Sequence, residues 1–426
     1  MSVSDQNPPF LVRFSQRMMA TSSSRIALIL IGVVLVPALK IMMAIRNSGK
    51  ERVKISDRIL FENLNTDARG ETEALEAQVN AKAQAGDWEG LDQLVSGWDD
   101  ECTSESGGYR YTQRATPVVI GPFAEPLESG DCAALPASAI DYNWLEEIEL
   151  AFATRPGNRT LGACLALAHK TAAWARRGGD YADQVTEEGW EGYQLHMERA
   201  QEVLAECIAH HPQSAMLARL HAHSLVGAAD ADREVIEAFE HALALDPTNW
   251  NFCSAFGFHL LPRWYGDYDQ LDIAARRHLA ATEADAGAAA YAAFYMEALE
   301  RDPGCFLMID TDLFKQGVLD LLTHVGSGQR LVNYTLATLS LLLAPRMSDH
   351  REGWEGIPEA RAALYPVVRA IMEDHLTCIM PQFWANGEDQ ARIALWEAFD
   401  PEIREGMTLR VTENGIQLDE PEQEAS

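Results

Sequence analysis

Few residues in this chain have the types and spacing that metal or acid–base chemistry requires. His221 and His223 are two positions apart, so on a helix they point to different sides and are poorly placed to share a metal ion. Asp310 and Asp312 could bind a cation, but Asp312 stands where a helix is expected to begin. The sequence contains no H-E-x-x-H, Walker, G-x-S-x-G or G-x-G-x-x-G motif. We therefore expect no catalytic residue, no metal and no cofactor.

A turn at residues 262–268 combines helix-ending and helix-starting residues with aromatic side chains. Pro262 ends one helix, Gly266 permits a tight turn, and Asp267 can cap the next helix. Trp264 and Tyr265 are expected to fill the space between neighbouring helix pairs. In this interpretation the turn is structural.

The same turn could instead line a binding groove. Arg263, Trp264 and Tyr268 are the candidate protein- or ligand-binding residues, because Arg, Trp and Tyr are the usual anchors of binding surfaces. In the structural alternative, Arg263 hydrogen-bonds carbonyl groups at a helix end. Both interpretations are compatible with the sequence.

The cysteines do not form a recognisable disulfide framework or zinc site. Their number is odd and no C-x-x-C pair occurs. Cys164, Cys207 and Cys253 lie in apolar helical contexts, where cysteine is a small core residue. Cys102 and Cys132 lie in a loop-rich stretch and could pair in an oxidising compartment. The seven cysteines are Cys102, Cys132, Cys164, Cys207, Cys253, Cys305 and Cys378.

The charge of the chain is strongly acidic and unevenly distributed. The formal net charge of the 426 residues is −30. Residues 1–60 carry nine Lys or Arg and three Asp or Glu, which leaves −36 on the remainder. Such an excess repels phosphate backbones, so nucleic acid is not an expected partner. It is typical of a soluble helical body, and a docking surface for basic partners is the alternative.

Residues 26–45, IALILIGVVLVPALKIMMAI, form a segment apolar enough to cross a membrane. Twenty helical residues span about 30 Å, the thickness of a bilayer core. The only charged residue, Lys40, is near the end of the segment, where its ammonium can reach the headgroups. Pro37 is tolerable in a membrane helix because neighbouring groups can satisfy the freed carbonyl. We expect a single-pass transmembrane anchor after a short tail at 1–25.

A cleavable signal peptide is the alternative for this segment. Residues 26–36 would be its apolar region, and Val36-Pro37-Ala38 is a weak cleavage signal. The apolar run continues past that signal, which favours an uncleaved anchor. Lys and Arg are more frequent after the span than before it, which places the large domain in the cytoplasm, whereas a signal anchor would place it outside.

From about residue 139 to 400 the chain reads as a succession of amphipathic helices, a mostly α fold. The helix-stop signals Asp246-Pro247 and Asp302-Pro303 are 56 residues apart, about two helical hairpins. Including the region before residue 139, we expect helices over 71–84, 87–98, 142–153, 161–177, 190–208, 215–227, 233–245, 251–261, 268–282, 288–301, 306–325, 330–343, 365–376 and 390–399.

The regions before and after this array are expected to differ from it in secondary structure. Residues 46–138 are expected to hold two short juxtamembrane helices and then a long loop at 101–138, which is rich in Pro and Gly and could include a short strand at Pro117–Ile120. Residues 401–426 are expected to form a β-hairpin around Asn414-Gly415 and then an acidic tail.

One segment resembles a tetratricopeptide repeat. Residues 238–249, AFEHALALDPTN, are similar to the second helix of that motif, although Val235 stands where alanine is usual. The first helix departs more, with Arg219 at the usual Trp position, His223 at the usual Gly and Val226 at the usual Tyr. The positions that carry the resemblance are Val235, Phe239, Ala242 and Pro247.

A second resemblance covers residues 80–345. Three segments, at 86–94, 173–193 and 261–271, look like a bacterial family of tetratricopeptide-like proteins of unknown function that carries a Pro-Arg-Trp-x-Gly segment. The resemblance implies an α-solenoid of helical hairpins and a bacterial source, so the predicted span would lie in the inner membrane. It implies no reaction.

These features together predict a membrane-anchored helical-repeat scaffold that binds a protein or peptide on a concave surface. Two alternatives remain. One is a self-associating structural protein of the cell envelope, which would form a homo-oligomer. The other is an enzyme whose site lies near the Pro-Arg-Trp-x-Gly turn and is assembled from distant residues.

Overall fold

The computed structural model describes residues 55–66, 70–105, 107–128, 133–181, 183–227, 232–324, 328–344, 346 and 352–420. The predicted membrane segment at 26–45 and the tail before it lie outside these residues, as do Cys132 and the end of the acidic tail at 421–426. Among the helices that are described, none is both long and apolar enough to cross a bilayer.

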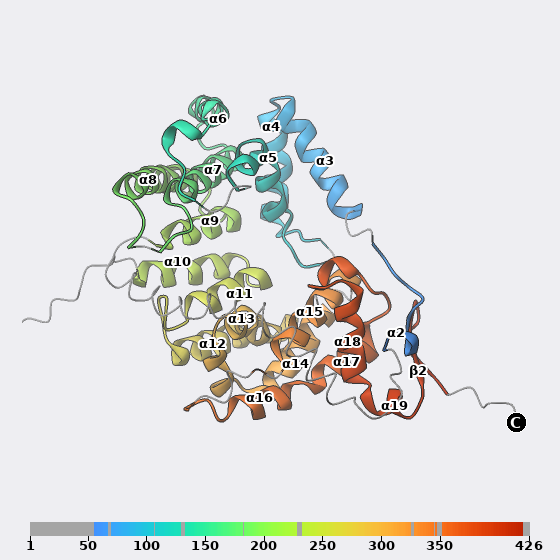
Figure 1. Cartoon of the computed structure of the whole chain (residues 1–426). Coiled ribbons are helices and arrows are strands. Elements are labelled where there is room, and N and C mark those ends of the chain that lie inside the picture. Colours follow the sequence, from blue (N-terminus) through green and yellow to red (C-terminus); the bar gives the residue numbers. More distant parts are fainter. Residues whose placement is uncertain are drawn as a thin grey trace, which may run out of the picture.

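The described chain is mostly helical, as predicted, with one small sheet near its C-terminus. In Figure 1 the helices follow one another along an arc, and α7, α9, α11 and α15 lie nearer its centre than α8, α12 and α16. The helices are α2 (Ile55–Arg58), α3 (Gly70–Gln84), α4 (Trp88–Asp100), α5 (Tyr111–Glu128), α6 (Asn143–Ala153), α7 (Arg159–Arg177), α8 (Glu187–His210), α9 (Ala215–Leu225), α10 (Asp232–Leu245), α11 (Trp250–His259), α12 (Tyr268–Ala286), α13 (Ala289–Arg301), α14 (Thr311–His324), α15 (Gln329–Leu342), α16 (Ile357–Leu364), α17 (Pro366–His375), α18 (Glu388–Ala398) and α19 (Asp400–Arg404), with short 3-10 turns η1 (Ala137–Ala139), η2 (Pro303–Leu307) and η4 (Pro381–Phe383).

Side-chain caps fix where many of these helices begin. Each capping oxygen accepts a hydrogen bond from a backbone N–H of the first turn, which has no partner within the helix. The predicted cap at Asp267 is confirmed. The capping residues are Asp87 (α4), Asn158 (α7), Thr186 (α8), Ser214 (α9), Asn249 (α11) and Asp267 (α12).

A helix, α5, occupies residues 111–128 in the middle of this stretch, so the predicted long loop with a strand at Pro117–Ile120 is wrong. Its three prolines all lie on the exposed side, where water can bond the carbonyl groups that each proline leaves free. Each proline costs a helix about 3 kcal/mol, and burial of the opposite face offsets that cost. The buried face comprises Thr112, Ala115, Thr116, Val119, Ile120, Phe123 and Ala124.

The predicted C-terminal hairpin is confirmed, and a third strand joins it. Strands β2 (Thr408–Thr412) and β3 (Gly415–Asp419) pair in antiparallel register around the Asn414-Gly415 turn. Strand β1 (Ile59–Phe61) pairs in parallel with β2, with Ile59 opposite Leu409. The sequence did not predict β1, because three residues are too few for an alternating pattern.

This parallel pairing brings the first described residues to the far end of the helical array. Beyond β1, Leu64 forms a parallel bridge with Ile379, and the Asn63 amide donates a 2.8 Å bond to the Thr377 carbonyl. The chain then returns to the other end of the array, where α5 packs on α7 (Figure 1). Residues 55–128 therefore link both ends of the array.

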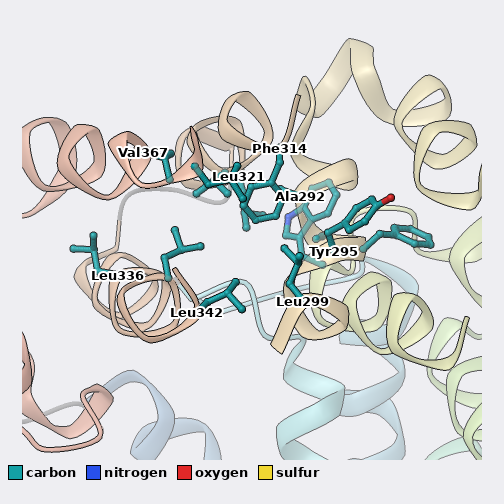
Figure 2. Packing of buried hydrophobic residues seen from close by; sticks show 14 of the residues in the cluster. Ala292, Tyr295, Leu299, Phe314, Leu321, Leu336, Leu342 and Val367 are labelled. Carbon is teal, nitrogen blue, oxygen red and sulfur yellow. The ribbon is translucent and has the colours of Figure 1, made fainter. Parts of the chain in front are cut away.

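Two large apolar cores stabilise the molecule. One joins residues 75–124 to residues 140–220, and the other runs from residue 218 to the C-terminal sheet. Gly257 lets α11 approach α13 closely, because a Cβ at that position would lie 1.9 Å from the Phe294 carbonyl oxygen. Figure 2 shows the second core where α13, α14, α15 and α17 meet, with Ala292, Tyr295, Leu299, Phe314, Leu321, Leu336, Leu342 and Val367.

A buried ion pair attaches the connection between α4 and α5 to the middle of the array. The Arg110 guanidinium binds both carboxylate oxygens of Asp246, one of them through a 2.8 Å Nε–Oδ2 bond. It also donates a 2.8 Å bond to the Thr248 hydroxyl. Both side chains of the pair are less than 10% exposed. Asp246 belongs to the helix-stop signal recognised in the sequence, so the residue that ends α10 also receives this distant arginine.

We expect Arg110→Ala to lower the free energy of unfolding by about 3 to 5 kcal/mol, because it leaves the Asp246 carboxylate buried without its cation. Urea unfolding followed by circular dichroism measures the change. Arg233→Ala is the control, since the Arg233 side chain is 89% exposed, and its unfolding midpoint should match the wild type. Equal midpoints for both variants would contradict the structural role of the pair.

Candidate functional site

The turn at 262–268 packs between helix pairs, as its structural interpretation predicts. Asp267 caps α12 by accepting a 2.8 Å bond from the Gln270 N–H. Tyr265 is buried, and its hydroxyl accepts a 2.7 Å bond from the Gly227 N–H at the end of α9. Trp264 is half-buried, and its ring centroid lies 5.2 Å from that of Phe258. The turn thus connects α9, α11 and α12.

The polar ends of the other two predicted binding residues meet at the Asp302-Pro303 helix stop. Arg263 donates to the Arg301 carbonyl, the helix-end bond that was predicted, and its guanidinium lies 3.8 Å from the Asp302 carboxylate. Burial, together with the negative charge of Asp302, raises the pKa of the Tyr268 hydroxyl. Arg263 and Tyr268 therefore share a partner within the chain, and binding of a second molecule by these residues stays a prediction.

Two cations deep in the molecule have no such partner. Within the described ranges, every Lys and Arg side chain makes a hydrogen bond or ion pair except Lys170 of α7 and Arg219 of α9. These two are also close enough for their charges to repel, which helps to lower the pKa of Lys170. Burial is the larger cause and takes the pKa of Lys170 to about 8 and that of Arg219 to about 10. Neither side chain is fully covered, so both retain some contact with solvent.

Two histidines extend this basic cluster of Lys170, Arg219, His223 and His259. His223 is four residues after Arg219, so it shares a face of α9, and its ring lies 6.4 Å from that of His259 on α11. Burial and the nearby Lys170 charge lower the pKa of His259 to about 4 and hold the pKa of His223 well below its usual value. The Nδ1 atom of His259 is buried and has no hydrogen-bond partner. Both rings are therefore neutral at pH 7.

The carboxylates near Arg219 are bound by other groups. Asp246 receives Arg110 and the Asn249 amide. Asp99 accepts 2.9 Å and 2.7 Å bonds from the Arg159 guanidinium and the Met216 N–H. These two acids and Arg219 line one small pocket, together with Trp98, Cys102, Arg110, Thr112, Ala215, Met216 and Asn249. Their negative charge acts on Arg219 only through space.

Cys102, in the same pocket, has an unusual backbone conformation. Its φ of 48° is the one left-handed value for a non-glycine residue in the described part of the chain. It follows α4, where the Thr103 N–H bonds the Trp98 carbonyl, the arrangement that normally takes glycine. Burial raises the pKa of its thiol to about 11, so the thiolate is disfavoured. The proposed pairing with Cys132 lies outside the described residues.

A second polar cluster links α6, α7 and α8 through consecutive hydrogen bonds. His169 Nδ1 lies 2.9 Å from His196 Nδ1, and His169 Nε2 lies 3.0 Å from the Glu149 carboxylate. His196 Nε2 in turn lies 3.2 Å from the Tyr142 hydroxyl. The Arg199 guanidinium closes the other end with 2.9 Å and 2.8 Å bonds to Glu149.

The partners of this histidine relay (Tyr142, His196, His169 and Glu149) fix its protonation. The Arg199 bonds lower the pKa of Glu149, so its carboxylate is ionised and His169 Nε2–H donates to it. Neutral His169 then carries no proton on Nδ1, and this atom must accept a hydrogen bond from His196 Nδ1–H. His196 Nε2 therefore carries no proton and accepts a hydrogen bond from the Tyr142 hydroxyl. Each hydrogen bond of the relay is donated in the direction of Glu149, and each ring nitrogen of the two histidines has a hydrogen-bond partner.

The relay is consequently a closed network that joins three helices. It lies beside an open hollow lined by Tyr142, Leu145, Glu146, Glu149, Leu150, Ala153 and His169. Burial lowers the pKa of His169, and burial with repulsion from His169 lowers the pKa of His196 to about 4. No serine or cysteine belongs to this network, so it lacks the nucleophile of a serine or cysteine hydrolase.

The remaining sequence candidates have structural roles. Asp310, rather than Asp312, begins α14, because its carboxylate accepts a 3.1 Å bond from the Leu313 N–H. No group of three His, Cys, Asp or Glu able to hold a metal occurs in the residues that the structure describes. Sequence reasoning missed Lys170, His259 and the histidine relay, in which each hydrogen-bonded pair is 20 or more positions apart in the sequence. The only available signal was Arg219 at a position where the tetratricopeptide motif has tryptophan.

Comparison with known proteins adds no relative to this picture. No protein-family model, no curated protein and no solved structure matches the chain.

We expect acid to weaken the fold through His196. Its pKa is lower in the folded protein than the usual 6.5, so the unfolded chain binds more protons between pH 6.5 and about 4, and stability falls as the pH falls through that window. One pKa unit corresponds to about 1.4 kcal/mol, so His196 accounts for up to about 3 kcal/mol of this loss.

Urea unfolding at pH 7, 5.5 and 4 measures the effect in His196→Gln, which can still hydrogen-bond but does not titrate in this range. Its stability should fall less with acid than that of the wild type. His210→Gln, at an exposed position, is the control and should follow the wild type. An equal loss in wild type and His196→Gln would show that the relay is not acid-sensitive.

Proposed function

We propose that this protein is a membrane-anchored helical-repeat scaffold whose tetratricopeptide-like array binds a protein or peptide on its inner face. The observation that carries the proposal is the pair of cations, Lys170 and Arg219, on neighbouring inner helices without any bonding partner in the chain. An unpaired buried charge is costly, and proteins retain such costs mainly where they bind something. The resemblance at 238–249 supports the repeat assignment, since it falls on α10, the outer helix after α9.

The proposed anchor also orients the array. Nine residues, 46–54, separate the apolar segment at 26–45 from α2, and they can extend at most about 30 Å. Because β1 follows α2 directly and pairs with the C-terminal hairpin, that end of the array would lie nearest the membrane. The inner face of α7 and α9, at the opposite end, would then be free to receive a partner away from the lipid.

We expect the full-length protein, crosslinked in its source membranes, to capture a stoichiometric partner identified by mass spectrometry. Lys170→Glu and Arg219→Glu should each reduce that capture at least tenfold, because they reverse charges on the binding face. Arg233→Glu, an exposed position on α10, should leave it unchanged. A partner retained by both the Lys170→Glu and the Arg219→Glu variants would contradict binding at this face. Recovery of the bait alone, as a stable oligomer in sedimentation, would favour the structural alternative.

We expect alkaline carbonate to leave the full-length protein in the membrane pellet. Ile31→Lys combined with Val34→Lys should release it, because each charge at the centre of a span costs about 3 kcal/mol. Ser22→Lys, before the apolar segment, is the control. The intact mass of the purified protein separates the two alternatives for this segment, since a cleaved signal peptide would remove residues 1–38 or a similar length.

A further inference from the structure

We propose that Lys170 of α7 and Arg219 of α9 bind one oxyanion group, a phosphate or a carboxylate, between their side chains. This inference rests on the proposed function in one respect, because the group would normally be carried by the bound partner. The chemistry of the site, however, is independent of the partner and can be tested with free anions.

The first argument is the distribution of paired and unpaired cations. The chain supplies a hydrogen-bond or ion-pair partner to each of the other Lys and Arg side chains in the described ranges. Even Arg233, the most exposed of those in ion pairs, bonds Glu237 four residues later. The two exceptions lie within interaction distance of one another, deep in the molecule, where a missing counter-ion costs most.

The second argument is that the chain cannot supply the missing anion itself. Asp99 and Asp246 are the acids whose charge reaches Arg219, and both already bond an arginine and other donors. Turning either carboxylate toward Arg219 would break the cap of α9 or the attachment of Arg110. Lys170 has no acid among the groups that act on its charge. The negative charge must therefore come from outside.

The third argument is the match between these side chains and an oxyanion. A guanidinium offers parallel N–H donors to two oxygens of one carboxylate or phosphate, and an ammonium adds a point charge to a third position. His259 brings a buried nitrogen without a hydrogen-bond partner within reach of the Lys170 charge. Neutral His223 on the same face as Arg219 can donate a hydrogen bond without adding to the repulsion.

The site is selective for compact anions. The molecule carries a net charge of −30, so a polyanion such as nucleic acid is repelled before it reaches these two side chains. A single phosphate or carboxylate group on an otherwise uncharged or basic ligand avoids that repulsion. Small size and one terminal negative group are therefore the features that the site recognises.

The test is isothermal titration of the full-length protein with inorganic phosphate and, separately, with acetate, at constant ionic strength set by sodium chloride. We expect saturable binding of at least one of the two, and the stronger one identifies the chemistry of the natural group. Lys170→Met and Arg219→Met should each weaken binding at least tenfold. Lys315→Met, which removes a cation paired with Asp312 on α14, should bind like the wild type.

A second readout separates a binding site from a structural role. Lys170→Met should raise the melting temperature of the anion-free protein, because it removes an uncompensated charge, and should abolish the rise that phosphate or acetate gives the wild type. A structural cation would instead lower the melting temperature when removed. If Lys170→Met does not fold, Arg219→Met provides the same comparison.

A third readout follows the ionisation of Lys170 directly and does not depend on a variant that loses binding. In protein whose lysines carry ¹³C-methyl groups, the signal that is absent from Lys170→Met should titrate near pH 8, and bound anion should move that titration to higher pH. No binding of either anion and an unchanged Lys170 titration would overturn the oxyanion site, even if a partner is captured through other contacts. Anion binding without any captured partner would leave this site standing and contradict the scaffold proposal.

Discussion

The buried ion pair between Arg110 and Asp246 is the interaction on which the rest of this molecule depends. It fixes the connection between α4 and α5 against the end of α10, and it uses both oxygens of Asp246, one of the two carboxylates whose charge reaches Arg219. The same contact that joins the N-terminal helices to the array therefore leaves a cation unpaired in the pocket beside it. The ion pair therefore both stabilises this contact and keeps the Asp246 carboxylate from bonding Arg219.

The two polar clusters of the interior differ in how far the chain satisfies them. In the histidine relay, each ring nitrogen of His169 and His196 has a partner, and Arg199 neutralises the carboxylate at its end. Such a network stabilises the contact of three helices and leaves little to attract a ligand. In the basic cluster, Lys170 and Arg219 repel one another, and neither bonds an acid. Unsatisfied groups, rather than titratable groups as such, mark the place where a second molecule can gain binding energy.

Closure of the chain gives this array a defined inside. Open helical arrays have two apolar ends that need capping. Here α3, α4 and α5 cover one end. At the other end, the parallel pairing of β1 with β2 attaches α2 and β1 to the C-terminal hairpin (Figure 1). Long-range backbone pairing of this kind fixes which helix faces are enclosed.

The sequence by itself determined the helices, because apolar periodicity, Asp-Pro stops and Asn or Asp caps are local signals, and it determined the hairpin at Asn414-Gly415. It misassigned α5, whose three prolines argue for a loop until burial of the opposite face outweighs them. It also named Arg263 and Tyr268 as anchors, without showing that both reach Asp302. Only the tertiary structure decided which cations remain unpaired, because pairing depends on residues such as Arg110 and Asp246, 136 positions apart. Local patterns specify helices, whereas charge balance in the interior is a property of the packed whole.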